Sequence, residues 1–232
     1  MTSSTSKSPY LLGLTRALPF VIVVVPFAML FGVVATEAGL PLLQTMAFSM
    51  LVVAGASQFA ALQFMSENAP VLVVLASALA VNLRMAMYSA SITPYLGEAP
   101  MWQRVIISYF LVDQSYAMSH AEFEARPTMT LREKLAYFAG VSTPICPLWF
   151  GSSYVGAVLG DRIPAEHGLD FAMPIAFLAM VAPALRTPAH MAAAFVSIVL
   201  ALGLFWVPLN LGLLLAALCA MMVGAEIERR MT

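Results

Sequence analysis

Long apolar runs separated by short polar stretches dominate the pattern of this chain. The runs do not alternate between polar and apolar positions, so they indicate helices and not the strands of a β-barrel. About 20 apolar residues are enough for a helix to cross the hydrocarbon core of a bilayer. The pattern predicts membrane spans at residues 17–36, 41–62, 70–92, 104–121, 136–160, 169–185, 190–207 and 209–225.

The last two predicted spans form one apolar run that is too long for a single crossing. Pro208 interrupts it within Trp206-Val207-Pro208-Leu209-Asn210. Proline removes a backbone donor and disfavours helix at the residue before it, which favours a tight turn here. A single kinked helix is the alternative, so the pattern predicts seven or eight transmembrane helices.

Composition supports the bilayer as the solvent of this chain. The 232 residues are 61% hydrophobic and 10% charged, with a mean hydropathy of +0.89, whereas an ordinary soluble domain is about one quarter charged. We therefore expect an all-α, polytopic integral membrane protein whose residues 1–232 form a single transmembrane domain. The first apolar run lacks a small-residue cleavage site and is interpreted as a retained helix. The net charge of −1 and the lack of a basic stripe argue against nucleic-acid binding.

The distribution of Lys and Arg predicts the orientation, because cytoplasmic loops carry an excess of these residues. With the N-terminus inside, only Arg104 and Arg162 fall outside, and Arg84 lies within a span. The cytoplasmic side then holds Lys7, Arg16, Arg126, Arg132, Lys134, Arg186, Arg229 and Arg230. An even number of crossings with both termini in the cytoplasm is the expected topology.

A weak internal repeat relates residues of about 13–121 to residues of about 136–225. Gly39-Leu40 before Met46-Ala47-Phe48 resembles Gly168-Leu169 before Ile175-Ala176-Phe177. Transporters are often built from such repeats, with the substrate site at their interface. Four spans per half make the repeat parallel, one re-entrant segment makes it inverted, and chance similarity between apolar helices is the third alternative.

Arg84 and Asp113 are the most informative polar residues of the pattern, because charged side chains are costly inside a membrane and usually functional. Arg84 lies eight residues before the end of the span at Ile92, and Asp113 lies nine residues into the next span. At about 1.5 Å per residue both lie roughly 12–14 Å from the same surface. The short connection between the spans predicts antiparallel neighbours, so the two charges are expected to pair.

The function of this pair has two interpretations. It either forms a structural ion pair, or it faces a wet cavity and holds the two ends of a zwitterion. In the second case Arg84 binds a carboxylate, while Asp113 binds an ammonium or relays a proton. Helical spacing places Tyr109 and Tyr116 on the face of Asp113, and Tyr88 on the face of Arg84. Asn82 either caps the site or makes a hydrogen bond across helices.

A second candidate site lies at the end of the span at 41–62, in Gly55-Ala56-Ser57-Gln58. Small residues there favour a close helix crossing. The alternative is a broken helix whose freed backbone groups, together with Ser57 and Gln58, line a cavity. The corresponding position in the repeat, Ala182–Pro188, contains two prolines, and interrupted segments at corresponding positions are typical of transport sites.

The remaining features suggest packing more than chemistry. Gly156 and Gly160 form a GxxxG pattern that is typical of helix packing, and Trp149 either borders a cavity or only packs. Cys146 and Cys219 lack the spacing of a metal or disulfide site, and the segment from Glu122 to Lys134 is interpreted as a solvated linker. Because there is no nucleotide, metalloprotease or cofactor motif, we expect no enzyme activity, no metal and no cofactor.

The polar and small residues, taken in order, resemble the AzlC-type large subunit of branched-chain amino acid permeases. The resemblance runs from about Gly13 to the C-terminus and departs from the family at Gln114, where an acidic residue is common. It is carried by Pro26…Phe31-Gly32, Gly55-Ala56-Ser57-Gln58-Phe59, Asn82-Leu83-Arg84, Tyr88-Ser89, Pro94, Asp113 and Trp149-Phe150-Gly151…Gly156…Gly160.

The resemblance implies a permease of the bacterial inner membrane that exports branched-chain amino acids together with a small AzlD-type membrane subunit. The residues expected to contact the substrate are Arg84, Asp113, Asn82, Ser57, Gln58, Tyr88, Tyr109, Tyr116 and Trp149. The alternative is a membrane scaffold or assembly subunit that transports nothing and whose buried polar residues only hold partner helices.

Overall fold

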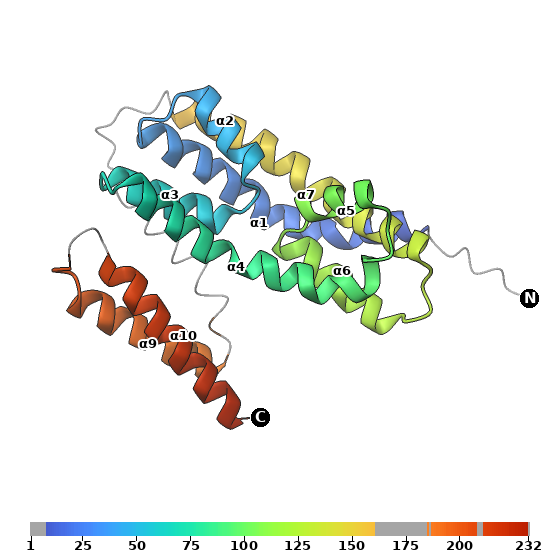
Figure 1. Ribbon diagram of the computed structural model, residues 1–232. Helices are drawn as coiled ribbons and strands as arrows, with labels where there is room; N and C mark the ends of the chain where they lie inside the picture. The colour runs from blue at the N-terminus through green and yellow to red at the C-terminus, as the bar shows by residue number, and fades with distance from the viewer. Residues whose placement is uncertain (1–7, 161–184, 186, 208–210, 232) are drawn as a thin grey trace, which may run out of the picture. The chain divides into compact units, whose positions relative to one another are not determined.

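The computed structural model describes residues 8–160, 185, 187–207 and 211–231 (Figure 1). All regular structure in these ranges is helical. The helices are α1 (Pro9–Glu37), α2 (Leu42–Leu51), α3 (Gly55–Ser66), α4 (Val71–Leu96), α5 (Met101–Tyr109), α6 (Asp113–Ala125), α7 (Leu131–Gly160), α9 (Pro188–Gly203) and α10 (Leu211–Met231). The expected span at 169–185, most of the expected interruption at Ala182–Pro188, and the repeat residues Gly168-Leu169 and Ile175-Ala176-Phe177 lie outside the described residues.

The chain forms two compact units. Unit 1 comprises Met1–Gln58 and Ala80–His167, and unit 2 comprises Phe59–Leu79 and Gly168–Thr232. The candidate residues all belong to unit 1. The single transmembrane domain and its repeat of residues 13–121 and 136–225 stay predictions.

Unit 1 is built around the parallel pair of α1 and α7 (Figure 1). A Cβ on Gly13 would overlap Tyr137 of α7, and a Cβ on Gly32 would overlap Ser153. Because the residue numbers of both helices rise together, the two helices run in the same direction. Gly156 lies against the backbone of Met29, which confirms that the GxxxG pattern is a packing face. Small residues at such a crossing allow two backbones to approach closely.

The segment at 41–62 is two helices, α2 and α3, that are separated at Val52–Ala54. Helix α2 follows the end of α1 and runs back along α1, since Phe48 of α2 packs against Phe31 of α1 with ring centroids 5.8 Å apart. After the break, the Gln58 side-chain amide donates to the carbonyl of Phe48 at 3.2 Å. The chain therefore reverses at the break, and α3 begins alongside α2.

The segment at 104–121 has the same construction, with α5 and α6 separated at Phe110–Val112. The residue numbers of contacting partners increase along both α4 and α6, from Tyr88 with Asp113 to Tyr95 with Phe123. Helix α6 is thus parallel to α4 and returns to the end where α4 finishes and α5 begins. The pair is a helical hairpin, and its tip is the break; inside a membrane such a hairpin would be re-entrant.

The two breaks share one hydrogen-bond pattern, in which every bond of the first recurs 58 positions later (Val52 to Phe110, Ser57 to Ser115). In the first break the bonds are Val52 N to Phe48 O (3.0 Å), Ala54 N to Val52 O (2.8 Å), Gln58 N to Ala54 O (3.0 Å) and Ser57 Oγ to Ala54 O (3.0 Å). In the second they are Phe110 N to Ile106 O (3.1 Å), Val112 N to Phe110 O (3.0 Å), Tyr116 N to Val112 O (2.9 Å) and Ser115 Oγ to Val112 O (3.0 Å). The same local structure has formed twice.

Three expectations about these segments are wrong. Residues 41–62 and 104–121 are not continuous helices, and Tyr109 does not share a helix face with Asp113 and Tyr116. The antiparallel neighbour of α4 is α5, whereas α6, which carries Asp113, is parallel to it. An apolar run of spanning length does not distinguish a crossing from a hairpin, and neither Val52–Ala54 nor Phe110–Val112 contains Gly or Pro.

Only α1 and α4, among the described helices, are both long and apolar enough to span a membrane by themselves, so the expected seven or eight crossings are not confirmed.

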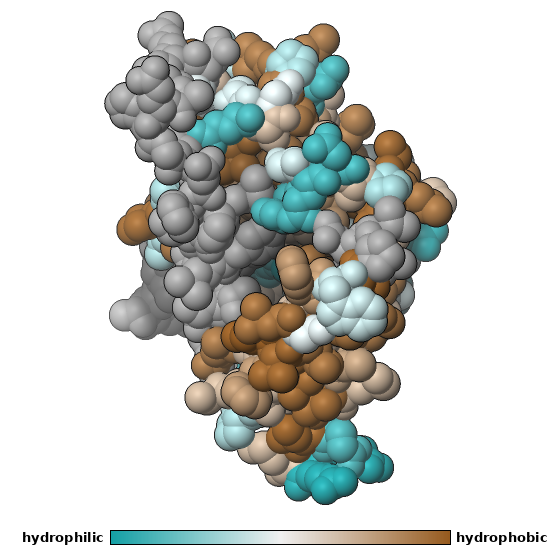
Figure 2. All heavy atoms as spheres, turned by 90° about the vertical axis from the view of Figure 1, so that its left-hand side faces the viewer, coloured by the Kyte–Doolittle hydropathy of each residue, from teal (hydrophilic) through white to brown (hydrophobic). Residues whose placement is uncertain are grey.

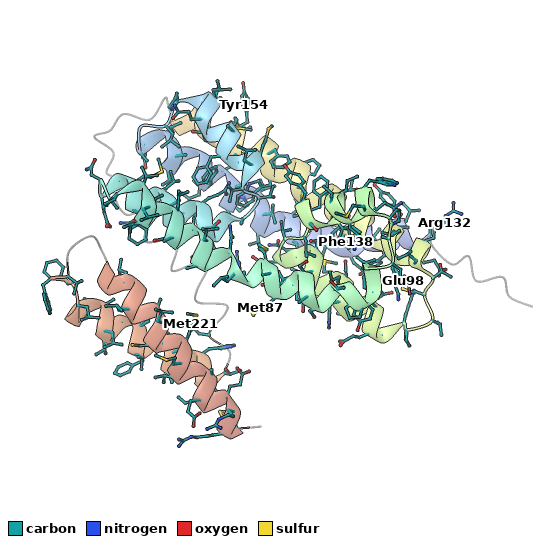
Figure 3. The ribbon with its side chains drawn as sticks, viewed as in Figure 1. Met87, Glu98, Arg132, Phe138, Tyr154 and Met221 are labelled. Carbon is teal, nitrogen blue, oxygen red and sulfur yellow. The ribbon has the colours of Figure 1, made fainter. Side chains whose placement is uncertain are left out.

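Among the described residues of unit 1, the cationic side chains other than Arg84 lie at one end. The start of α1, the end of α4, the start of α5, the end of α6 and the start of α7 meet there, and Figure 3 shows Glu98 and Arg132 at this end. Arg104 therefore lies on the same side as Arg126, and the expectation that these two lie on opposite sides is wrong. This basic end carries Arg16, Arg104, Arg126, Arg132 and Lys134.

Helix α7 begins at this end with a capping interaction. The backbone N–H and the hydroxyl of Thr130 donate to the Glu133 carboxylate at 2.8 and 2.9 Å, which lowers the pKa of that carboxyl. A carboxylate in the first turn also complements the positive end of the helix dipole. The polar start of α7 is thus fixed before its apolar stretch begins.

In unit 2, α9 and α10 form an antiparallel hairpin. Gly224 faces Ala193, and Gly212 lies against Leu204. The segment therefore forms two helices, and the single kinked helix is excluded; Pro208 itself lies outside the described residues. Hydrophobic side chains dominate the surface of the hairpin, and a hydrophilic cluster marks its end (Figure 2). There Glu226 pairs with Arg229 and Arg230 at 2.8 and 2.7 Å.

The contact between α1 and α7 predicts that Gly156→Ala destabilises the protein, because the new methyl group meets the backbone of Met29. Overpacking of this kind costs about 1–3 kcal/mol. The matched control is Gly151→Ala on the same helix, where nothing lies within 4 Å of the added Cβ. Thermal unfolding in detergent should show a lower midpoint for the first variant only. Equal midpoints for the two variants would contradict the proposed contact.

The re-entrant hairpin predicts that the loops before α5 and after α6 face the same side of the membrane. Single cysteines at Glu98→Cys and Thr128→Cys, in a chain with Cys146 and Cys219 replaced by Ser, should react with an impermeant maleimide from one side only. Ala38→Cys, after the opposite end of α1, should react only from the other side. Labelling of the first two positions from opposite sides would show that α5 and α6 cross the membrane together.

Candidate functional site

The tips of the two hairpins are joined by a hydrogen bond. The hydroxyl of Tyr109, at the end of α5, donates to the backbone carbonyl of Met50 in the last turn of α2 at 2.6 Å. Carbonyls in the last turn of a helix lack partners within the helix. Tyr109 therefore satisfies a backbone group that the first break frees, and it connects the two breaks. Val53 of the first break also packs on the same apolar cluster as Leu111 and Val112 of the second.

Arg84 and Asp113 form the charged part of the site. A terminal guanidinium nitrogen of Arg84 lies 3.2 Å from Asp113 Oδ2, and the two side chains are 27% and 41% exposed. The Tyr88 hydroxyl donates to Asp113 Oδ1 at 3.0 Å. Asp113 is the first residue of α6, where the helix dipole also stabilises a carboxylate. The predicted pairing is confirmed, and the partial exposure leaves both groups accessible to a polar ligand.

Tyr116 extends this cluster along α4 and α6. Its ring stacks on that of Tyr88 with centroids 4.2 Å apart and an angle of 10° between the planes. Its hydroxyl donates to Ser91 at 3.0 Å. The buried Nε of Arg84 and Oδ1 of Asn82 have no hydrogen-bond partner among the described residues. Because residues two positions apart on a helix do not face each other, Asn82 is not part of the cluster that Arg84 forms with Asp113.

At the first break, Trp149 packs against Gly55, the residue from which α3 continues to Ser57 and Gln58. The Trp149 ring packs between Phe27 and Phe31, at centroid distances of 5.9 and 6.3 Å. Its Cη2 atom lies 2.7 Å from where a Cβ of Gly55 would be, so only glycine leaves room for the ring. Ser57 caps the break through Ala54, as described above, which gives its hydroxyl a structural role.

A groove leads from the basic end to the second break. Its volume is about 370 Å³, and it runs between α4 and α5 from Gly97 and Arg104 to Ser89 and Leu111. Thr93 and Ser108 line it halfway. The groove is an open path with hydroxyl groups along a largely apolar wall.

A buried carboxylate at the basic end was not predicted from the sequence. Glu122, near the end of α6, is 5% exposed and pairs with Arg16 of α1 and with Arg126, the latter at 3.1 Å. Its interpretation as part of a solvated linker is wrong. The partner Arg16 lies 106 positions away, so no local spacing indicates the pair; it depends on the return of α6 to the start of α1.

The described residues contain no group of three His, Cys, Asp or Glu side chains that could hold a metal ion. Cys146 is a buried free thiol, and Cys219 is partly buried and also free. The polar groups of the site are thus a guanidinium, a carboxylate, hydroxyls, amides and an indole. Such groups bind small charged or zwitterionic ligands.

These features define a helical membrane protein with paired hairpins and a charged centre between helices. Residues 19–163 match the family described as AzlC protein, which covers more than half of the chain. The chain belongs to the AzlC family. This is a family of permease-type membrane proteins, and the resemblance found in the sequence is confirmed.

Individual relatives agree with a membrane location. The inner membrane protein YgaZ of Escherichia coli K12 is 24% identical over 181 residues, which cover 75% of this chain and 73% of YgaZ. An uncharacterized membrane protein of Archaeoglobus fulgidus is 26% identical over 190 residues, 80% of each chain. One from Helicobacter pylori 26695 is 25% identical over 206 residues, with 86% and 88% coverage. No solved structure matches this chain.

The Glu122 cluster predicts that Glu122→Gln destabilises unit 1, because two arginines lose their carboxylate. Hydrogen bonds to charged groups contribute about 1.5–3 kcal/mol, and the half-exposed arginines place the expected loss at the lower end. The control is Glu124→Gln on the same helix, whose carboxylate is 61% exposed and lies 3.6 Å from His120. Thermal unfolding midpoints measure both changes. An unchanged midpoint for Glu122→Gln would contradict a stabilising role for the cluster.

Proposed function

We propose that this protein is a secondary transporter that exports branched-chain amino acids across the bacterial inner membrane, together with a small AzlD-type membrane subunit. The observation that supports this most is the position of Arg84 and Asp113. They lie at a hairpin tip and are partly exposed, near the inner end of a groove from the basic end. Interrupted helices that place charged groups near the middle of a membrane are typical of transport sites.

The chemistry of the site suits a zwitterion with an aliphatic side chain. Asp113 is the acceptor for an ammonium group or a coupling proton, and Arg84 has its unpaired Nε to donate to a carboxylate. Leu111 and Val112 supply an apolar wall at the same tip. Tyr88 and Tyr116 hold the carboxylate side of the pair in place.

The basic end is proposed to face the cytoplasm, because cytoplasmic segments are enriched in Lys and Arg. Arg104 now joins the cationic residues on this side, which strengthens the asymmetry. The groove then opens to the cytoplasm, and the first hairpin enters from the opposite face. Substrate would enter through the groove and leave past the first break.

Counterflow of labelled valine, leucine and isoleucine in proteoliposomes tests this proposal directly. Vesicles with the chain and its small subunit should accumulate label above empty vesicles when preloaded with unlabelled substrate. Flux at the level of empty vesicles would contradict transport and favour the scaffold alternative.

Arg84→Lys should lower transport by at least about tenfold while expression is retained, since lysine keeps the charge but lacks the planar set of donors. Arg104→Lys, at the mouth of the groove, is the matched control and should transport nearly normally. Loss of folded protein together with transport in Arg84→Lys would show that the pair is only structural.

A further inference from the structure

The groove between α4 and α5 has an apolar floor. Its buried lining residues are all aliphatic: Ile92, Leu96, Ile107 and Leu111. Two hydroxyls on its rim already have partners within their own helices. Thr93 Oγ1 donates to the carbonyl of Ser89 at 2.6 Å. In the same way, Ser108 Oγ donates to the carbonyl of Arg104 at 2.8 Å. The wall of the groove therefore suits a hydrocarbon chain.

Arg104 is the cation at the mouth of this groove. It lies in the first turn of α5, lines the groove and is exposed. Its guanidinium contacts the sulfur of Met101 at 3.3 Å, and it has no carboxylate partner among the described residues. By contrast, Arg16 and Arg126 at the same end both pair with Glu122. Because the positive end of the α5 dipole lies beside Arg104, the two attract an anion together.

The mouth of the groove lies at the level of lipid headgroups. Helix α4 is long and apolar enough to span a membrane, and its last residue, Leu96, lines this end of the groove. Trp102, in the first turn of α5, is 64% exposed, and tryptophan is enriched where membrane and water meet. Basic groups between helices at this level bind the headgroups of anionic lipids.

We propose that the groove is a binding site for an anionic phospholipid, with the phosphate on Arg104 and one acyl chain along the aliphatic floor. Charge complementarity favours an anionic lipid, because Arg104 has no carboxylate to neutralise it and a zwitterionic headgroup brings a cation of its own. The site goes beyond the proposed function. Since substrate would enter through the same groove, a bound chain and an entering amino acid exclude each other.

Native mass spectrometry of the full chain in detergent tests the headgroup contact. The probes are dioleoylphosphatidylglycerol and dioleoylphosphatidylcholine, which share their acyl chains and differ in headgroup charge. Wild type should retain the glycerol lipid more strongly. Arg104→Gln should weaken that lipid roughly tenfold and leave the choline lipid unchanged, since a charge-assisted hydrogen bond is lost. Arg132→Gln, an exposed cation of the same end outside the groove, is the matched control and should bind like wild type.

Thr93→Trp tests the chain contact, because an indole on the rim halfway along the groove takes the place of the acyl chain. It should weaken both lipids, whereas Met87→Trp, at an exposed position of α4 outside the groove, should weaken neither. A large excess of inorganic phosphate should not displace the glycerol lipid from wild type.

Three results would overturn the lipid site. Equal losses in Arg104→Gln and Arg132→Gln would show a general attraction to the basic end. Unchanged lipid binding in Thr93→Trp would show that the chain does not use the groove, and displacement by inorganic phosphate would show a simple anion site. None of these measurements depends on transport, so each result leaves the test of the proposed function independent.

Discussion

The hydrogen bonds that a helix loses when it breaks inside a membrane control this structure. Each unpaired backbone group in hydrocarbon costs several kcal/mol, so a break persists only where other groups satisfy it. Here Ser57 and Ser115 close the breaks locally, Tyr109 satisfies the carbonyl of Met50, and Asp113 caps α6 electrostatically. The polar residues of the chain are therefore concentrated where the backbone needs them, and the same places supply the groups for a ligand.

The charged pair follows from the same constraint. An arginine within a membrane span needs a partner, and the hairpin delivers one by ending α5 at the level of Arg84. Asp113 then satisfies Arg84, Tyr88 and the first turn of α6 together. Because both charges stay partly exposed, the pair differs from a sealed structural ion pair. Rigid packing of α1 on α7 through glycines gives the two hairpins a fixed frame.

Sequence reasoning succeeded where a single local rule decides the outcome. The apolar runs predicted helices, the GxxxG pattern predicted close packing, and residue counting placed Arg84 and Asp113 at one depth. That count was right although the helix was not continuous, since α5 alone spans the distance to Asp113. The small residues after Ala54 also indicated a broken helix.

The rest depended on contacts that sequence spacing does not encode. The segment Phe110–Val112 is apolar and contains neither glycine nor proline, the residues that usually interrupt a helix. The second break was therefore not predicted. Glu122 meets Arg16 only because α6 reverses direction. The repeat of 58 residues is visible in hydrogen bonds, and Ser57 and Ser115 are the matching side chains that take part in it. Gly55 and Asp113, which correspond in structure, have nothing in common as residues.

A structure of the chain and its small subunit in a lipid bilayer with bound valine tests the central claim most directly. The account predicts density for the amino acid at the tip of the hairpin of α5 and α6, with its carboxylate within hydrogen-bond distance of Arg84. Density for valine away from this tip, in a preparation that transports, would contradict it.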